Sequence, residues 1–280
     1  MTEKQQVREP VYSQRRELLK GIVSGATVAV GGSTAVAGDE PSGSGARSAS
    51  GPQGNVTNTI RDANNQLVLA GGGWAVRNVG FKGHRGAGSP AVAAAVTDPG
   101  GSAVIEGCYL GDGGNGPGVW VQPEHAGTLV VRNCYFEGWG DNGLYGSPPG
   151  NPSNHPRPGN GGAVRVENCY AKNNATSNFR LGTDGSALKN SVSFGSQRGY
   201  WGFYGRTRVV GCDISGGIHA GSSNWQDNAV VQIRNTSFSG GKHTHYDGAT
   251  IEGSSQGQPS DRLPGVPTSP GAAKNGNLQG

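Results

Sequence analysis

Leu129-Val130-Val131-Arg132-Asn133-Cys134-Tyr135-Phe136 decides the fold, because six further segments of the chain repeat this pattern. Each copy alternates β-branched with polar residues, reaches an Asn or Gly, and continues through one small residue into a second short apolar segment. The copies are 21 to 35 residues apart, which is typical of a solenoid whose coils differ by insertions in their loops. The anchor residues that directly follow the Asn or Gly are Val79, Cys108, Cys134, Cys169, Ser191, Cys212 and Thr236.

The residue before each anchor is Asn in five copies and Gly in two. These residues accept a left-handed backbone most readily, so each copy is expected to bend sharply between two strands. Coils stacked about 4.8 Å apart would form parallel sheets, along which the Asn side chains can form a ladder. The pattern resembles the right-handed parallel β-helix of the pectate-lyase-like superfamily over about residues 60–250. We therefore predict an all-β, right-handed parallel β-helix of about seven coils. A Greek-key sandwich would not place Asn at one repeat position five times.

The composition is typical of a turn-rich β protein. Of the 280 residues, 52 are Gly and 16 are Pro, while only 15% are charged. The low charged content argues against a coiled coil, and the lack of a G-X-Y period excludes collagen. The formal net charge is +4, and Lys and Arg are scattered singly along the chain. The sequence therefore predicts neither a nucleic-acid partner nor a membrane-surface patch, and we expect a monomer.

The N-terminus resembles a twin-arginine export signal. Arg15 and Arg16 precede two Leu residues, a weakly apolar run follows, and Ala35-Val36-Ala37 has the small-x-small pattern of a signal peptidase site. The resemblance implies cleavage after Ala37 and a secreted or cell-surface protein of a bacterium or archaeon. The alternative is a retained anchor, for which a run of about 16 residues is short. We predict a signal peptide (1–37), a flexible linker (38–54), the β-helix (55–253) and a disordered tail (254–280), with no membrane span in the mature protein.

Four of the seven anchors are cysteines: Cys108, Cys134, Cys169 and Cys212. We predict that they point into the coil as small apolar side chains. A disulfide between neighbouring coils is an alternative, because stacked Cα atoms lie within bridging distance. A metal site is a further alternative, although the chain contains no CxxC pair.

A second short strand follows five of the anchor phrases, and a Gly comes directly after it in four copies. Large outward side chains on neighbouring strands generally mark a binding surface, and flat rings suit the CH face of a sugar. Alternatively, the Pro-rich insertion Gly146–Gly162 packs over this stripe and converts it into a satellite core. The expected outward positions are Trp120, Leu144, Arg180, Phe203 and His219, and the expected substrate-binding residues are Trp120, Tyr145, Phe203 and Tyr204.

Acidic and basic residues near this stripe are candidates for catalysis. A polysaccharide lyase needs a base, often Arg or Lys, and a glycoside hydrolase needs two carboxyl groups about 5–10 Å apart. Asp residues in Gly-rich loops more often form turns, and no family catalytic signature is present, so the resemblance assigns no catalytic residue. The candidate catalytic residues are Arg180, Asp184, Asp141 and His219, with Glu137 and Asp227 as outlying candidates.

His243, His245 and Asp247 have the spacing of a metal triad, but they fall in the last coil, where a polar cap is expected. We predict no metal and no cofactor. The function expected from the resemblance is action on extracellular or cell-surface polysaccharide, as a lyase or glycoside hydrolase. The alternative is a non-catalytic glycan-binding or surface-structural protein, and the fold alone does not separate the two. A pair of carboxylates in the groove, or Arg180 beside Asp184 above an open cleft, would favour catalysis.

Overall fold

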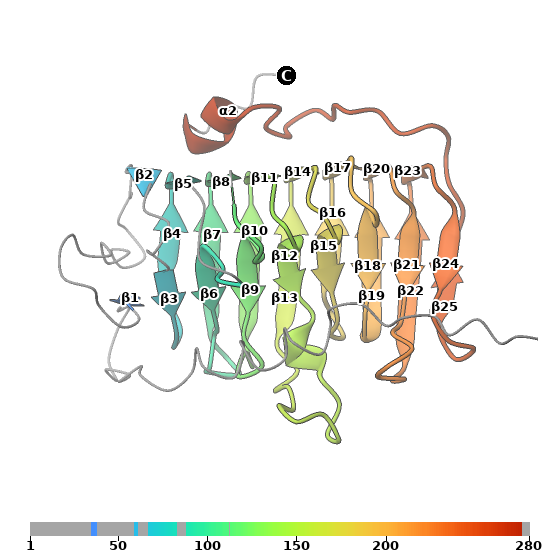
Figure 1. The fold of residues 1–280 in the computed structure, drawn as a ribbon, viewed down its shortest axis with the longest axis horizontal. Coiled ribbons are helices and arrows are strands. Elements are labelled where there is room, and N and C mark those ends of the chain that lie inside the picture. Colours follow the sequence, from blue (N-terminus) through green and yellow to red (C-terminus); the bar gives the residue numbers. More distant parts are fainter. Residues whose placement is uncertain (1–34, 38–58, 61–66, 83–87, 112, 276–280) are drawn as a thin grey trace, which may run out of the picture.

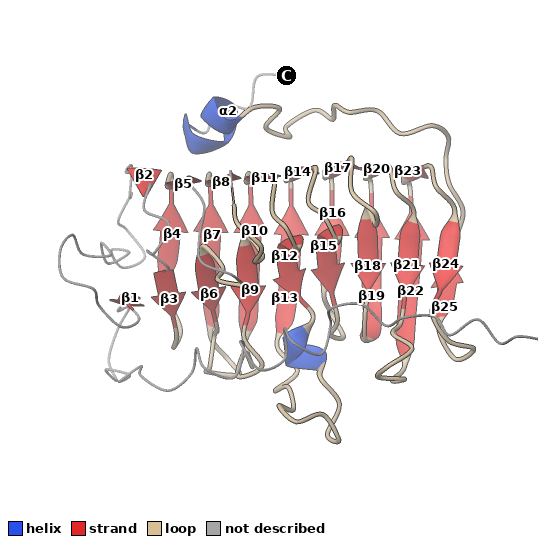
Figure 2. Cartoon of the chain, in the orientation of Figure 1, coloured by secondary structure: helices blue, strands red, loops and turns tan. Residues whose placement is uncertain are grey.

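A computed structural model describes residues 35–37, 59–60, 67–82, 88–111 and 113–275. They form a parallel β-helix of about seven coils with very little helix, which confirms the predicted fold class (Figures 1 and 2). Each complete coil contributes one strand to each of three sheets, in the order sheet C, sheet B, sheet A. Neighbouring strands are parallel throughout, except that β1 pairs antiparallel with β3.

The strands of each sheet follow one another along the long axis of the molecule (Figure 1). Sheet A contains β1 (Ala35–Ala37), β3 (Leu67–Leu69), β6 (Val92–Ala94), β9 (Val119–Val121), β12 (Asn142–Gly146), β15 (Ser177–Leu181), β18 (Tyr200–Gly202), β21 (Ile218–Ala220) and β24 (Lys242–Thr244). Sheet B contains β2 (Thr59–Ile60), β5 (Gly80–Lys82), β8 (Tyr109–Gly111), β11 (Tyr135–Glu137), β14 (Tyr170–Lys172), β17 (Val192–Phe194), β20 (Asp213–Ile214) and β23 (Ser237–Phe238). Sheet C contains β4 (Ala75–Arg77), β7 (Ser102–Glu106), β10 (Thr128–Arg132), β13 (Ala163–Glu167), β16 (Ala187–Lys189), β19 (Gly205–Val210), β22 (Ala229–Arg234) and β25 (Thr250–Glu252).

All seven turn residues between sheets C and B have the predicted left-handed backbone. The five Asn residues have φ between 43° and 56°, and Gly107 and Gly211 have φ of 62° and 65°. Backbone amides along this column donate to the next coil, as the Asn133 N–H does to the Glu167 carbonyl at 3.1 Å. A Cβ atom on Gly107 would lie 2.5 Å from the Asn78 Oδ1 atom, so the asparagine of one coil occupies the space that this glycine leaves.

A second left-handed column, which the sequence analysis missed, ends the strands of sheet B. It consists of one Asn and four Gly residues with φ between 56° and 85°. These residues turn the chain from sheet B towards sheet A in successive coils. They are Gly138, Asn173, Gly195, Gly216 and Gly240.

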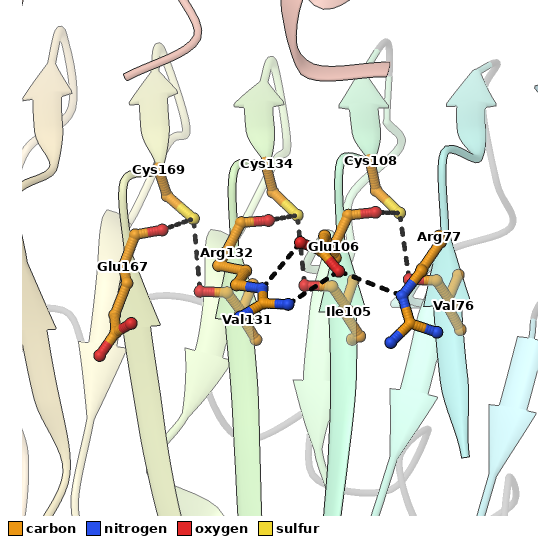
Figure 3. Close-up of polar contacts among 10 residues, drawn as sticks. All are labelled: Val76, Arg77, Ile105, Glu106, Cys108, Val131, Arg132, Cys134, Glu167 and Cys169. Atoms are coloured by element: carbon orange, nitrogen blue, oxygen red, sulfur yellow. Dashed lines mark hydrogen bonds and ion pairs between the residues drawn. The ribbon is translucent and has the colours of Figure 1, made fainter. Parts of the chain in front are cut away.

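The anchor column points into the coils, and its four cysteines are buried and free. Figure 3 shows three of them, Cys108, Cys134 and Cys169. Each thiol donates to the carbonyl two residues earlier, at 3.2 Å in Cys134. The hydroxyls of Ser191 and Thr236 make the same contact in their coils, at 2.7 and 2.9 Å. Burial raises the pKa of the Cys108 and Cys134 thiols well above the ordinary value. The prediction of small, inward-pointing core residues is confirmed, and the four cysteines form no disulfide.

Charged side chains of alternating sign form an ion-pair ladder along the end of sheet C. Arg77, Glu106, Arg132, Glu167 and Lys189 occupy one column on five successive strands. Glu106 accepts from Arg77 at 3.1 Å and from Arg132 at 2.8 Å (Figure 3). The Lys189 ammonium group lies 3.7 Å from the Glu167 carboxylate. These contacts join neighbouring coils on the outside, as the core joins them on the inside.

Residues 254–275 form a strap that runs back across sheet B and ends in the short helix α2 (Pro270–Asn275) (Figure 1). The sequence predicts a disordered tail here, whereas the strap buries Val266 and Ala273 against the outer side of sheet B. That side carries a stack of tyrosines, in which the rings of Tyr135 and Tyr170 lie 5.0 Å apart. Small, widely spaced apolar residues are enough to cover this stack, which is why no periodic pattern marks the strap.

Most of the predicted export signal, including Arg15 and Arg16, lies outside the described residues. Ala37, the predicted cleavage position, is the last residue of β1 at the first edge of sheet A. Within the described part of the chain, no helix combines the length and the apolar character needed to cross a bilayer.

Candidate functional site

The outer face of sheet A carries a column of mostly large side chains, one from each coil. The sequence predicts this column with two errors, because it places Leu144 and Phe203 where the structure has Tyr145 and Trp201. Leu144 is fully buried inside the coil, and Phe203 follows the end of β18. In the observed register the column reads Ala93, Trp120, Tyr145, Arg180, Trp201, His219 and His243.

Both errors come from glycines that were taken to follow the strand directly, since Gly146 lies within β12 and Gly205 begins the next strand, β19. Gly146 and Gly202 are the last residues of β12 and β18. A Cβ atom on Gly146 would lie 2.9 Å from the Leu181 side chain, and one on Gly202 would collide with Val231. These glycines leave space for side chains of neighbouring coils, so they do not mark turns.

Arg180 lies near the middle of the column, within an aromatic cage formed by Tyr145, Trp201 and Phe203. Its guanidinium carbon is 3.5 Å from the centre of the Phe203 ring, 4.2 Å from that of Tyr145 and 4.8 Å from that of Trp201. All three distances are within the range of cation–π attraction. The Arg180 Nε atom is buried without a hydrogen-bond partner, and no described residue forms an ion pair with the guanidinium group. The cage therefore holds a permanent positive charge without a counter-anion from the described chain.

The aromatic residues of the site are packed more tightly than the sequence analysis expects. Trp201, Phe203 and Tyr204 are 8%, 5% and 2% exposed, and Trp225 packs against them. A second guanidinium group, that of Arg198, lies 4.3 Å from the centre of the Trp201 ring. Phe203 and Tyr204 were predicted to contact substrate, but their rings form a small core of their own.

The insertion after β12 also approaches the column. It begins with the 3-10 helix η2 (Pro148–Gly150), and its Arg157 lies 5.5 Å from the centre of the Trp120 ring. Trp120 is 4% exposed. The ring centre of His155, in the same insertion, lies 4.5 Å from that of Trp225. The covered-stripe alternative therefore holds for much of the column. The accessible parts of the column are a compact region around the half-buried Tyr145 and Arg180 and the exposed His243 in the last coil, rather than a long groove.

The two carboxylates that were expected to pair lie at opposite ends of the strands of sheet A. Asp141 directly precedes β12, and its carbonyl accepts from the Thr176 N–H at the start of β15. Asp184 follows the end of β15, and its Oδ1 accepts from the Arg206 N–H at 2.7 Å. Because the length of a strand separates Asp141 from Asp184, the two carboxylates cannot act on the same glycosidic bond. Each aspartate instead belongs to a turn at one corner of the coil.

The outlying acidic candidates are engaged elsewhere. The Glu137 carboxylate lies 3.1 Å from the Lys172 ammonium group on sheet B. The Asp227 carbonyl accepts from the Tyr246 hydroxyl, and its carboxylate accepts from the Asn228 N–H at 2.8 Å. Neither residue contributes to the aromatic cage.

His219 belongs to a cluster of three stacked histidines. Its ring lies 4.5 Å from that of His243 and 5.3 Å from that of His245, with nearly parallel planes. Its Nδ1 is 3.2 Å from the His245 Nε2, and its Nε2 is 3.2 Å from the Gly216 carbonyl oxygen. Burial, together with the charges of neighbouring His and Arg side chains, lowers the pKa of His219 to about 3. Both ring nitrogens are therefore used inside the protein, and the ring is neutral near pH 7.

Among the described residues, no three His, Cys, Asp or Glu side chains are arranged to hold a metal ion. The proposed triad of His243, His245 and Asp247 is thus not assembled. Comparison with protein families, with curated proteins and with solved structures finds no match for this chain.

The sequence analysis missed four residues of the site: Arg157, Arg198, Trp201 and Trp225. Trp201 could have been found, because Tyr200 and Gly202 flank it with the alternation expected of a strand. The other three approach from loops, where residue spacing carries no information about position.

Proposed function

We propose that this protein binds an acidic glycan through Arg180 on the outer face of sheet A, as a binding protein rather than as a lyase or hydrolase. The observation that supports this is the cationic Arg180 in its aromatic cage, without an anionic partner among the described residues. A guanidinium group pairs well with carboxylates, since its planar donors match their geometry. A uronate carboxylate or a sugar sulfate would supply the missing anion.

The cage has a defined part in this proposal. Trp201 and Phe203 hold the guanidinium group in place, which reduces the conformational entropy lost on binding. The half-buried Tyr145 offers the ring area that a sugar next to the anion can contact. The resemblance to the pectate-lyase-like superfamily also favours a polysaccharide as the ligand, and the resemblance of the N-terminus to an export signal favours a place outside the cell.

The separation of the carboxylates favours binding over catalysis. Asp141 and Asp184 lie at opposite ends of the strands, and both ring nitrogens of His219 are engaged. A hydrolase would need two carboxyl groups about 5–10 Å apart across the bond that is cleaved. The residues named for catalysis do not provide that pair.

The test is calorimetric titration of the full chain with a hexuronate disaccharide and with the neutral disaccharide of the same linkage. We expect binding of the acidic sugar only, and a loss of about tenfold or more in affinity for Arg180→Leu. Arg180→Lys should retain part of the affinity. Arg262→Leu removes the same charge from the exposed strap and should bind normally.

Two results would contradict the proposal. Equal affinity of the protein for the neutral sugar would show that the anion is not recognised. Shortened products after incubation with a polyuronate, absent in Arg180→Leu, would show that the site is catalytic.

A further inference from the structure

The outer face of sheet C gathers basic residues that are far apart in the sequence. Outward and inward residues alternate on each strand, as in β19, where Arg206 and Arg208 are exposed and Thr207 and Val209 are buried. The chain contains no basic run, so only the stacking of coils reveals this face. Its cationic residues are Arg77, Arg132, Arg165, Lys189, Arg206, Arg208 and Arg234, and its anionic residues are Glu106, Glu167 and Glu252.

The three glutamates are already engaged by other residues of this face. Glu106 and Glu167 belong to the ion-pair ladder, and Glu252 accepts from Gln232 at 2.8 Å and lies 3.9 Å from Arg206. The surplus consists of three exposed arginines whose guanidinium groups form no ion pair or hydrogen bond with any described residue: Arg165, Arg208 and Arg234.

The surplus arginines form a regular line together with Lys189. Arg165, Ala187 and Arg208 occupy one column on successive strands, and Lys189, Val210 and Arg234 occupy the adjacent column. The four cations therefore come from β13, β16, β19 and β22, one from each coil, and alternate between the two columns. Because coils are stacked about 4.8 Å apart, this cationic line presents about one cationic side chain per 4.8 Å along the axis. Lys189 pairs with Glu167, and the other three cations have no anionic partner among the described residues.

We propose that the cationic line is a docking surface for a linear acidic polysaccharide that carries about one carboxylate or sulfate per sugar. The line runs along the axis of the solenoid, so an extended chain can lie parallel to it and meet one cation per coil. Arginine suits this role, because its fork of donors binds carboxylate and sulfate oxygens in pairs. Exposed contacts of this kind are individually weak, so affinity depends on several of them acting together.

The spacing and chemistry of this face argue against other polyanions and surfaces. Duplex DNA carries one charge per about 1.7 Å, which is nearly three times denser than the cationic line. A bilayer surface is bound by faces that also insert aromatic or long apolar side chains. The uncharged outward residues described on sheet C are small or polar, such as Thr128, Val130 and Gln232.

This surface lies on a different sheet from Arg180, and the proposal does not require the sheet A site. The test measures binding of the full chain to immobilised alginate, a linear polyuronate, at low and at physiological salt. We expect the triple variant Arg165→Gln, Arg208→Gln, Arg234→Gln to bind alginate about ten- to a hundredfold more weakly at low salt, with a reduced salt dependence. Its unfolding midpoint should not change, because the three side chains are exposed.

The matched control is the triple variant Lys172→Gln, Lys242→Gln, Arg262→Gln, which loses the same charge from other faces. It should retain alginate binding. An equal loss in both triple variants would overturn the proposal, since net charge alone would then explain binding. Undiminished binding by the sheet C variant would also overturn it. Tighter binding of the unmodified chain to duplex DNA or to anionic lipid vesicles than to alginate, at the same salt, would show that the partner chemistry is wrong.

Discussion

The guanidinium group of Arg180 lies 3.5 Å from the ring centre of Phe203, which belongs to the next coil. The ring lies beyond the end of β18 and covers the charged group from one side. The aromatic residues of this face thus serve first to position a cation. Their value for a ligand would come from the charge that they hold in place.

Replacing Trp201 tests whether the cage is a unit of structure as well as of binding. Trp201 is 8% exposed and contacts two guanidinium groups, so Trp201→Ala should lower the free energy of unfolding by about 3 kcal/mol. It should also abolish binding of the hexuronate disaccharide. Trp201→Phe keeps a ring in the cage and should retain most of both properties. Urea unfolding and calorimetry measure the two effects, and an alanine variant with unchanged stability and affinity would contradict the assignment.

The stability of the fold should depend on the protonation of His219. Its pKa is about 3 in the folded protein, below its ordinary value of 6.5, so the unfolded chain binds more protons between these values. The stabilisation is complete above pH 6.5 and decreases as the pH falls towards 3. His219→Asn should therefore unfold with a weaker pH dependence than the original chain. The residual dependence comes from His125 and His245, whose pKa values are also lowered by burial.

Unfolding midpoints measured from pH 8 to pH 4 would show this difference. The control is His243→Asn, which alters an exposed member of the same cluster and should leave most of the pH dependence in place. Parallel curves for the original chain and His219→Asn would refute the prediction.

The left-handed turn column predicts losses of stability of different size for two small substitutions. Asn133 has φ of 54°, so Asn133→Ala should cost about 1–2 kcal/mol of stability, whereas Asn133→Gly should cost much less. Its Oδ1 atom is buried without a hydrogen-bond partner, so the backbone effect is not masked by a lost contact of this atom. Chemical unfolding of the two variants measures the difference. The same pair of changes at the exposed Asn154, whose φ is not positive, should show no advantage for glycine.

The strap should be required to protect the tyrosine stack of sheet B. Val266 is 2% exposed in a cluster with Tyr135, Tyr170 and Val192, so Val266→Asp buries a charge or detaches the strap. We expect a decrease in stability of about 1–3 kcal/mol and faster proteolysis within residues 254–275. Thr268→Asp, at an exposed position of the strap, should behave like the original chain. Equal protease resistance of both variants would mean that the strap does not depend on Val266.

The fold could be predicted because each copy of the repeat contains a residue that favours the same left-handed backbone turn. Asn133 and its equivalents each require a left-handed turn, and seven turns in a common pattern leave few alternatives to a solenoid. The inward direction of the cysteines follows from the same register, since Ser191 and Thr236 occupy equivalent positions. These inferences need only local conformation and stacking.

The site could be predicted only in part, because it depends on register and on loops. Gly146 and Gly205 were interpreted as the residues that follow a strand, although Gly146 is the last residue of β12 and Gly205 is the first residue of β19. Arg157 belongs to the insertion that follows β12 and covers Trp120 on the neighbouring strand β9, a contact that no spacing in the sequence encodes. The separation of Asp141 and Asp184, in contrast, was accessible, since one precedes its strand and the other follows it.

The alternating signs of the ion-pair ladder impose a parity rule on how this molecule can gain or lose coils. Deleting the coil that carries Glu106 would place Arg77 beside Arg132, and two like charges would then meet across neighbouring strands. Deleting that coil together with the next one would place Arg77 beside Glu167 and restore attraction. The same rule should hold for duplicated coils in this region, so adding an even number of coils would preserve the alternation of charges. The ladder therefore favours a change by an even number of coils, because only such a change keeps opposite charges on neighbouring strands.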